Sequence, residues 1–88
     1  MKVSYHKRFL KQPAKIPSGA RIPIEQFAFE SLPRVSSVAE LGKVEKMRGH
    51  DACYKARFGS YRVGMKLEGD ALTLRIVMDR KDIYWIFP

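Results

Sequence analysis

The stretch CYKARFGSYRVGMKLEGDALTLRIVM, residues 53–78, alternates apolar and polar side chains with a period of two. Two glycine-containing pairs, Gly59-Ser60 and Gly69-Asp70, interrupt the alternation where two-residue hairpin turns belong. The pattern predicts a three-stranded antiparallel meander, because a half-buried strand exposes every second side chain to water. The apolar face of this meander would consist of Tyr54, Ala56, Phe58, Tyr61, Val63, Met65, Leu67, Leu72, Leu74, Ile76 and Met78.

The opposite face of the meander is strongly cationic. With both turns closed, Arg57 faces Arg62, and like charges that face each other destabilise a sheet by about 0.2–1 kcal/mol. Gly64 would lie between Lys55 and Arg75, and a glycine inside a strand often marks the close approach of a ligand or another backbone. The full set on this face is Lys55, Arg57, Arg62, Gly64, Lys66, Thr73 and Arg75, with Glu68 as its only acid.

Two interpretations of the cationic face are open. In the first, the arginines splay into water and the face is simply solvated. In the second, which the facing arginines and the central glycine favour, the face binds an anion that offsets their repulsion. Phosphate suits it because the arginine fork matches a phosphodiester, whereas a sheet that reads bases by stacking exposes aromatic rings. We therefore expect an RNA backbone to contact Lys55, Arg57, Arg62, Lys66 and Arg75.

The N-terminal half predicts a short strand and two helices. The strand would span residues 2–5, and a first helix would span residues 7–12 and end at Pro13. A second helix would span residues 18–32, with Ala20, Ile24 and Phe27 on one face.

Proline and serine set the expected limits of the helical region. Pro23 argues either for a helix that starts near Ile22 or for a kink, and Pro33 should stop the helix. Ser37 and Glu40 have capping-box spacing, so a short helical turn should follow. The two helices can cover the apolar face of the meander. We therefore predict one α+β domain over residues 1–88, with a small antiparallel sheet and a helix pair packed on one face.

The composition limits the partners and the compartment. The chain of 88 residues is 45% hydrophobic, and 17 Lys and Arg against 9 Asp and Glu give a net charge of +8. This excess favours a polyanionic partner. A single cysteine, Cys53, excludes an internal disulfide and suits a reducing compartment. No apolar run is long enough to span a bilayer, so we expect a cytoplasmic protein without a membrane partner.

The C-terminal segment DRKDIYWIFP, residues 79–88, adds a candidate base. Arg80 and Tyr84 are four residues apart and would share a face if the segment forms a helical turn. A tyrosine beside cations on a phosphate-binding surface can remove a proton from a ribose 2′-hydroxyl. In the alternative interpretation, the aromatic side chains of this segment only plug the core. We prefer that interpretation for Trp85 and Phe87, and spacing alone leaves both open for Tyr84.

Residues 53–84, together with the strand and helix pair before them, resemble toxins of the RelE family from bacterial toxin–antitoxin systems. The most specific motifs are YKARFGSYRV and DRKDIY. The resemblance implies a ribosome-dependent endoribonuclease that enters the A site and cuts mRNA by attack of a 2′-hydroxyl on the adjacent phosphate. It also implies a cognate antitoxin that silences the toxin. The loop between the hairpin strands and the segment after Tyr84 are shorter here than in better-known members of the family.

The same resemblance implies roles for individual residues. Tyr84 matches the C-terminal tyrosine and would be the general base, assisted by Lys55 and Arg57. Arg62 would hold the phosphate, and Arg80 would help the leaving oxygen. No metal or other cofactor is implied. Some relatives use a glutamate and a histidine instead, but His6 and His50 do not match those positions and are interpreted as surface or turn residues.

A different class of function stays open on the same predicted fold. Related toxins poison DNA gyrase without cutting RNA, and a degenerate member would be only an antitoxin-binding module. The retained arginines and Tyr84 favour the nuclease over both alternatives.

Overall fold

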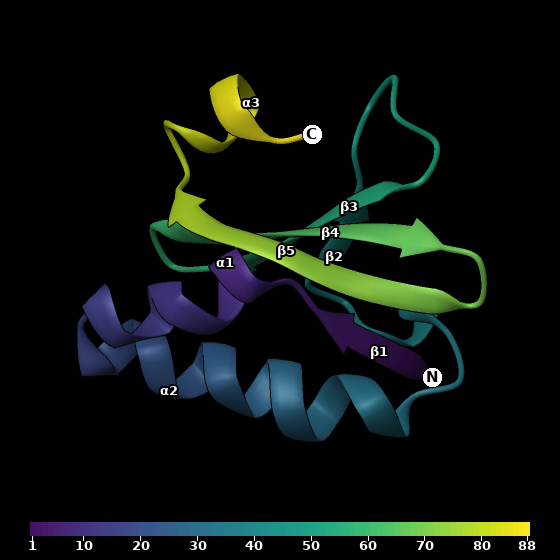
Figure 1. Cartoon of the computed structure of the whole chain (residues 1–88), viewed down its shortest axis with the longest axis horizontal. Coiled ribbons are helices and arrows are strands. Elements are labelled where there is room, and N and C mark those ends of the chain that lie inside the picture. The colour runs from purple at the N-terminus through teal and green to yellow at the C-terminus, as the bar shows by residue number, and fades with distance from the viewer.

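The computed structural model describes all residues from Met1 to Pro88 and contains one five-stranded sheet (Figure 1). The strand order is β1-β5-β4-β3-β2, with β1 parallel to β5 and every other pair antiparallel. The predicted α+β fold, the N-terminal strand and the meander are confirmed. Two features differ, since the sheet is mixed and β2 was not predicted. The strands are β1 (Lys2–Tyr5), β2 (Val44–Lys46), β3 (Cys53–Phe58), β4 (Tyr61–Glu68) and β5 (Ala71–Asp79).

The helical region from Lys7 to Arg34 alternates between α-helical, 3₁₀ and π-helical segments. The first α-helix ends at Lys11, just before Pro13, as expected, and Pro13 lies in the first turn of the 3₁₀ segment that follows, where its missing N–H is not needed. The second helix begins at Ser18 and contains Pro23 rather than starting near Ile22. Pro33 lies in a terminal 3₁₀ turn. The segments are α1 (Lys7–Lys11), 3₁₀ Gln12–Lys15, α2 (Ser18–Gln26), π-helical Phe27–Ser31 and 3₁₀ Leu32–Arg34.

A short helical turn, Val38–Glu40, follows as predicted. The Glu40 carboxylate accepts hydrogen bonds from the backbone N–H groups of Ser36 and Ser37, at 2.8 and 3.0 Å. This arrangement satisfies donors that a helix start otherwise leaves unpaired. None of the helices is both long enough and apolar enough to cross a membrane.

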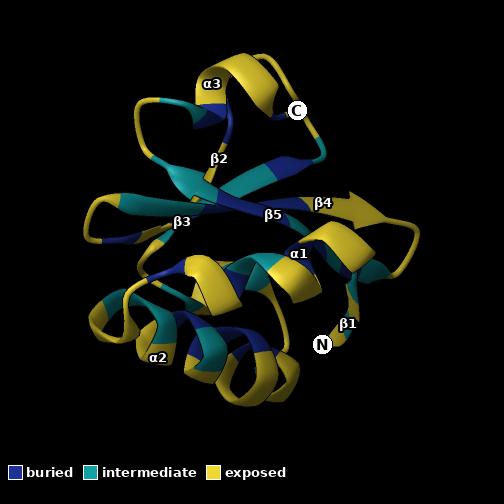
Figure 2. Ribbon diagram, turned by 60° about the vertical axis from the view of Figure 1, so that its left-hand side comes forward, coloured by how far each residue is buried: buried dark blue, intermediate teal, exposed yellow.

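The main core lies between the helices and the lower face of the sheet in Figure 1, as Figure 2 shows by burial. Phe9, Ile24 and Leu32 are fully buried there and pack against the sheet. Burial of a large apolar side chain contributes about 1.5–3 kcal/mol, so this layer supplies most of the apolar burial. The sheet contributes Ala56, Phe58, Val63, Met65, Leu72, Leu74 and Val77 to the same cluster.

A β-bulge reverses the faces of the second half of β5. Gly64 pairs with Ile76, while the next residue, Met65, pairs with Leu74, so Arg75 is the extra residue. Beyond the bulge, Val77 points into the main core and Ile76 lies on the opposite face. The predictions that Ile76 and Met78 join the main apolar face and that Arg75 lies opposite Gly64 are therefore wrong. A one-residue shift exchanges the two faces of a strand, and the alternating pattern does not reveal it.

The opposite face of the sheet carries a second apolar cluster that holds the C-terminus. Helix α3 (Ile83–Ile86) lies above this face (Figure 1). The ring of Phe87 covers Gly64 so closely that a Cβ at Gly64 would lie 2.7 Å from it. The close approach expected at Gly64 is thus made by the chain itself. Phe87 is buried, whereas Trp85 is 84% exposed and does not plug a core. The cluster consists of Met47, Cys53, Ile76, Ile83 and Phe87, with Met78 packed against it.

Candidate functional site

Strand β3 and helix α3 bring Lys55 and Tyr84 into contact. The Lys55 ammonium donates a hydrogen bond to the Tyr84 hydroxyl oxygen. The Lys55 side chain is only 15% exposed, whereas Tyr84 is 62% exposed. A cation bonded to a phenol oxygen stabilises negative charge on that oxygen, which a tyrosine acting as a base must carry. The pair therefore joins a largely buried ammonium group to a hydroxyl that solvent or substrate can reach.

Glu45, from the strand that was not predicted, lies opposite Lys55 in the register of β2 and β3. Its carboxylate oxygens lie 4.0 Å from Lys55 Nζ and 3.8 Å from Arg57 Nη2. Glu45 is 48% exposed and Arg57 is 57% exposed, so the Glu45–Arg57 pair is worth less than about 1 kcal/mol. Such a pair can exchange its carboxylate for a phosphate. Sequence patterns missed Glu45 because a three-residue strand carries almost no periodicity.

Arg57 and Arg62 face each other across the β3–β4 hairpin, as predicted. Their side chains nevertheless diverge, because Arg57 turns to Glu45 while Arg62 turns back to the hairpin. Arg62 Nη1 donates hydrogen bonds to the carbonyl oxygens of Gly59 and Tyr61, at 2.8 and 2.9 Å. Both arginines thus have partners within the chain, and a bound anion is not needed to separate them.

An open hollow of about 330 Å³ surrounds the Lys55–Tyr84 pair. Arg48 and His50, which come from the loop between β2 and β3, line it together with this pair. In Figure 1 that loop and α3 rise from the same side of the sheet and flank the open face. His50 is exposed in a turn, as expected, but its place beside Lys55 and Tyr84 was not predicted. The lining residues are Met47, Arg48, His50, Lys55, Tyr84, Phe87 and Pro88.

The remaining predicted residues lie apart from this hollow. Arg80 is in the turn between β5 and α3, and its backbone N–H donates to the carbonyl oxygen of Ser60 at 2.8 Å. Because α3 starts only at Ile83, Arg80 does not share a helical face with Tyr84. Lys66 and Arg75 line a second hollow. The structure therefore joins Tyr84 to Lys55, and links Lys55 to Arg57 through Glu45, whereas Lys66, Arg75 and Arg80 lie apart from this hollow.

No protein-family model matches the chain. It is 34% identical over 89 residues to the toxin RelE3 of Methanocaldococcus jannaschii, and the match covers 100% of both chains. The chain belongs to the RelE family of toxins. The resemblance of residues 53–84 to RelE toxins is thereby confirmed.

Solved structures support the RelE assignment. The chain aligns with one from the RelB–RelE antitoxin–toxin complex of Methanococcus jannaschii at a TM-score of 0.77 and 30% identity, covering 97% of this chain and 99% of the other. It aligns with the isolated RelE toxin of E. coli at a TM-score of 0.65 and 22% identity, covering 96% and 90%. The second match shows only that the fold is the same.

This RelE-family chain has no cluster of three or more His, Cys, Asp or Glu side chains that could hold a metal ion. Its ionisable groups on the open face are mostly cations, with Glu45 and Glu68 as the paired acids. The arrangement can bind an anion beside a tyrosine hydroxyl.

Proposed function

We propose that this chain is an endoribonuclease that cuts mRNA on the ribosome and so inhibits translation. The observation that carries the proposal is the hydrogen bond from Lys55 to Tyr84 at an open, cationic hollow. The face offers charge but no exposed aromatic platform on the sheet, so it would grip a backbone without selecting or orienting bases. An mRNA already ordered in the ribosomal A site would supply that orientation.

In the proposed reaction Tyr84 removes the proton from a ribose 2′-hydroxyl. The 2′-oxygen attacks the adjacent phosphorus, the bond to the 5′-oxygen breaks, and a 2′,3′-cyclic phosphate and a 5′-hydroxyl result. Lys55 stabilises the negative charge that the Tyr84 oxygen carries before it accepts the proton, and Arg57 exchanges Glu45 for the phosphate. Preorganised cations of this kind supply much of the rate enhancement in phosphoryl chemistry.

The leaving 5′-oxygen needs a proton and a neighbouring charge. Arginine keeps its proton, so Arg80 can only neutralise charge there, and it would have to swing in from the β5–α3 turn. Arg62 would leave the hairpin carbonyls to bind the phosphate. His50 lines the hollow beside Tyr84, and its ring, when it carries protons on both nitrogens, can donate one to the leaving oxygen and become neutral. No step of this proposed mechanism uses a metal ion.

A cognate antitoxin is the proposed regulatory partner. The relative from M. jannaschii was crystallised as a RelB–RelE antitoxin–toxin complex. A segment that is disordered when free and amphipathic when bound would cover the cationic face or displace α3. Either arrangement would separate Tyr84 from RNA.

The test is to map mRNA ends after brief induction of the wild type and Tyr84→Phe. We expect cuts clustered in translated frames for the wild type, and loss of most cuts for the variant, which loses only a hydroxyl. Tyr54→Phe is the matched control, because it also loses one hydroxyl but lies at a residue that packs against the main core. This variant should keep full activity. Full cleavage by a folded Tyr84→Phe protein would exclude Tyr84 as the base. Intact mRNA with stalled replication would instead favour a gyrase poison.

A further inference from the structure

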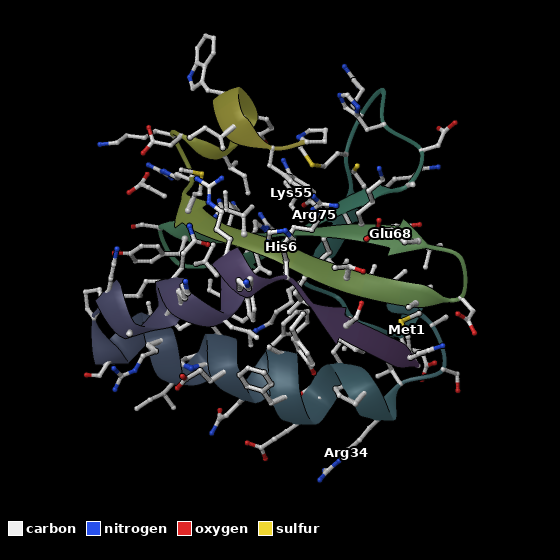
Figure 3. All side chains as sticks on the ribbon, viewed as in Figure 1. Met1, His6, Arg34, Lys55, Glu68 and Arg75 are labelled. Carbon is white, nitrogen blue, oxygen red and sulfur yellow. The ribbon has the colours of Figure 1, made fainter.

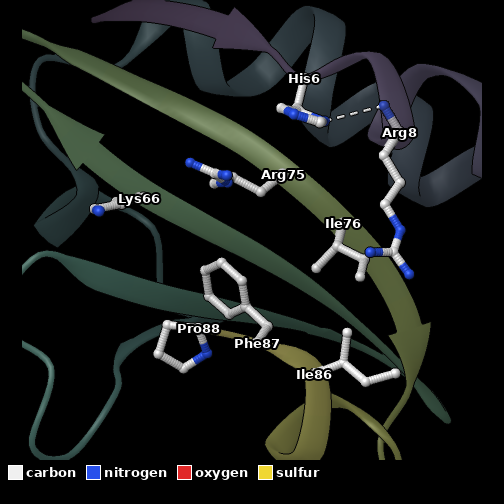
Figure 4. A pocket seen from close by; sticks show the side chains of 8 residues that line it. All are labelled: His6, Arg8, Lys66, Arg75, Ile76, Ile86, Phe87 and Pro88. Carbon is white, nitrogen blue, oxygen red and sulfur yellow. Dashed lines mark hydrogen bonds between the residues drawn. The ribbon is translucent and has the colours of Figure 1, made fainter.

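A second hollow, of about 230 Å³, is shown in Figure 4, and it shares Phe87 and Pro88 with the hollow at the Lys55–Tyr84 pair. Four basic side chains, from the start of α1, from β4 and from β5, converge on it, and its wall is apolar. The only acid paired with any of them is Glu68, which lies 3.8 Å from Arg75 Nη1 and is 46% exposed. The lining residues are His6, Arg8, Lys66, Arg75, Ile76, Ile86, Phe87 and Pro88.

The β-bulge and the start of α1 give this hollow its chemistry. Because Arg75 is the extra residue of the bulge, Arg75 and its neighbour Ile76 both line the hollow. His6 Nδ1 accepts a hydrogen bond from the backbone N–H of Arg8 at 3.1 Å, as the dashed line in Figure 4 marks. A ring nitrogen that accepts must be unprotonated, so the neutral ring carries its proton on Nε2. The hollow thus combines the three cations Arg8, Lys66 and Arg75 with the Nε2–H donor of His6.

The two hollows share Phe87 and Pro88 as lining residues and are therefore two sides of one wall. We propose that the second hollow binds the phosphodiester next to the one that is cut, on the same mRNA strand. The inference rests on the proposed nuclease function and adds a subsite to it. Arginine and lysine suit a phosphodiester, and the strand would cross the wall at Pro88.

Such a contact would position the strand without reading its sequence. A phosphate held by Lys66 and Arg75 fixes the distance along the backbone to the scissile phosphate at Lys55 and Tyr84. Because the pair between Arg75 and Glu68 is half exposed, a phosphate can replace the carboxylate at little cost. The proposed role of Lys66 and Arg75 is therefore to set the register of the mRNA and not to take part in the chemical step.

The test is a double-mutant cycle between protein and RNA on programmed ribosomes. The protein change is Lys66→Gln with Arg75→Gln, and the RNA change is a single uncharged methylphosphonate on the 5′ or the 3′ side of the cleaved bond. The double variant should cut ordinary mRNA at least about tenfold more slowly, because a tenfold change corresponds to the loss of one charge-assisted hydrogen bond. One of the two methylphosphonates should slow the wild type to a similar degree and should not slow the double variant further.

The matched control is Lys15→Gln with Arg34→Gln, which removes the same charge from exposed positions. Figure 3 shows Arg34 far from Lys55 and Arg75, beyond the helices. This control should respond to the methylphosphonate as the wild type does. Unfolding midpoints of both double variants check that each is folded.

Several results would overturn the subsite. The losses in cleavage rate could add independently at both methylphosphonate positions, or the control could lose as much as the double variant. Either result would mean that Lys66 and Arg75 only attract RNA by their charge and hold no particular phosphate. Unimpaired cleavage with lost antitoxin binding would assign the hollow to the antitoxin. If Tyr84→Phe abolishes cleavage while the Lys66 and Arg75 changes have no effect, the subsite fails and the nuclease stands. If the wild type cuts no mRNA, both proposals fail.

Discussion

Arg57 and Arg62 illustrate what a strand register can and cannot predict about a residue. The register placed them opposite each other, and the structure confirms that pairing. Whether the charges repel depends on the last side-chain torsions, which take Arg57 to Glu45 and Arg62 to two carbonyl oxygens. Those partners come from β2 and from the turn, and the alternating pattern carries no information about them. Pairing was therefore predictable from sequence, and its electrostatic consequence was not.

Gly64 permits a residue-level prediction about the C-terminal cover. In Gly64→Ala, the new Cβ would lie 2.7 Å from Phe87 Cδ2 and 2.9 Å from Ile76 Cγ2. We expect a loss of about 1–3 kcal/mol in the free energy of unfolding, typical of an overfilled core. The displaced Phe87 should also weaken the Lys55–Tyr84 contact and slow cleavage. Urea unfolding and cleavage on ribosomes measure the two effects.

Gly42→Ala is the control for this change, because its Cβ would meet nothing within 4 Å. It should not lower stability. If Gly64→Ala slowed cleavage at full stability, Gly64 would be the approach point of a ligand after all.

The elements differ in how well the sequence predicts them. Strands β3 and β4 and both hairpin turns follow from local alternation, and the helices that cover them follow from spacing. The second half of β5 does not, because the bulge at Arg75 depends on how β5 packs between two layers. The parallel pairing of β1 with β5 is also a long-range choice that no local turn specifies.

The candidate site was predictable to the same extent as the elements that carry it. Lys55, Arg57 and Arg62 lie on regular strands, and their relative positions followed from register. Tyr84 was placed by resemblance to the family, and its contact with Lys55 depends on α3 folding back over the sheet. Glu45, Arg48 and His50 come from a three-residue strand and an irregular loop, so periodicity could not reveal them.

Helix α3 yields a prediction about an element, because its two sides differ sharply. Ile83 is fully buried in the second cluster, whereas Trp85 is 84% exposed. Ile83→Ala should cost about 2–5 kcal/mol and should also loosen Tyr84 from Lys55, although Ile83 does not line the hollow. Trp85→Ala should change stability by less than about 0.5 kcal/mol. Unfolding midpoints and cleavage rates of both variants test this, and a fully active Ile83→Ala protein would contradict the supporting role of α3.

The whole molecule carries a net charge of +8, so the rate at which it meets an antitoxin depends on the charge of the entire surface. Attraction summed over the surface should make association with an acidic antitoxin segment fast at low salt and much slower at high salt. The segment would compete with mRNA for Lys55, Arg57 and Tyr84. We therefore expect cleavage on ribosomes to fall in proportion to the toxin that is complexed, and stopped-flow association rates to fall steeply with ionic strength. An antitoxin complex that cut ribosome-bound mRNA at the rate of the free toxin would show that the two partners use separate surfaces, and the proposed means of silencing would then be wrong.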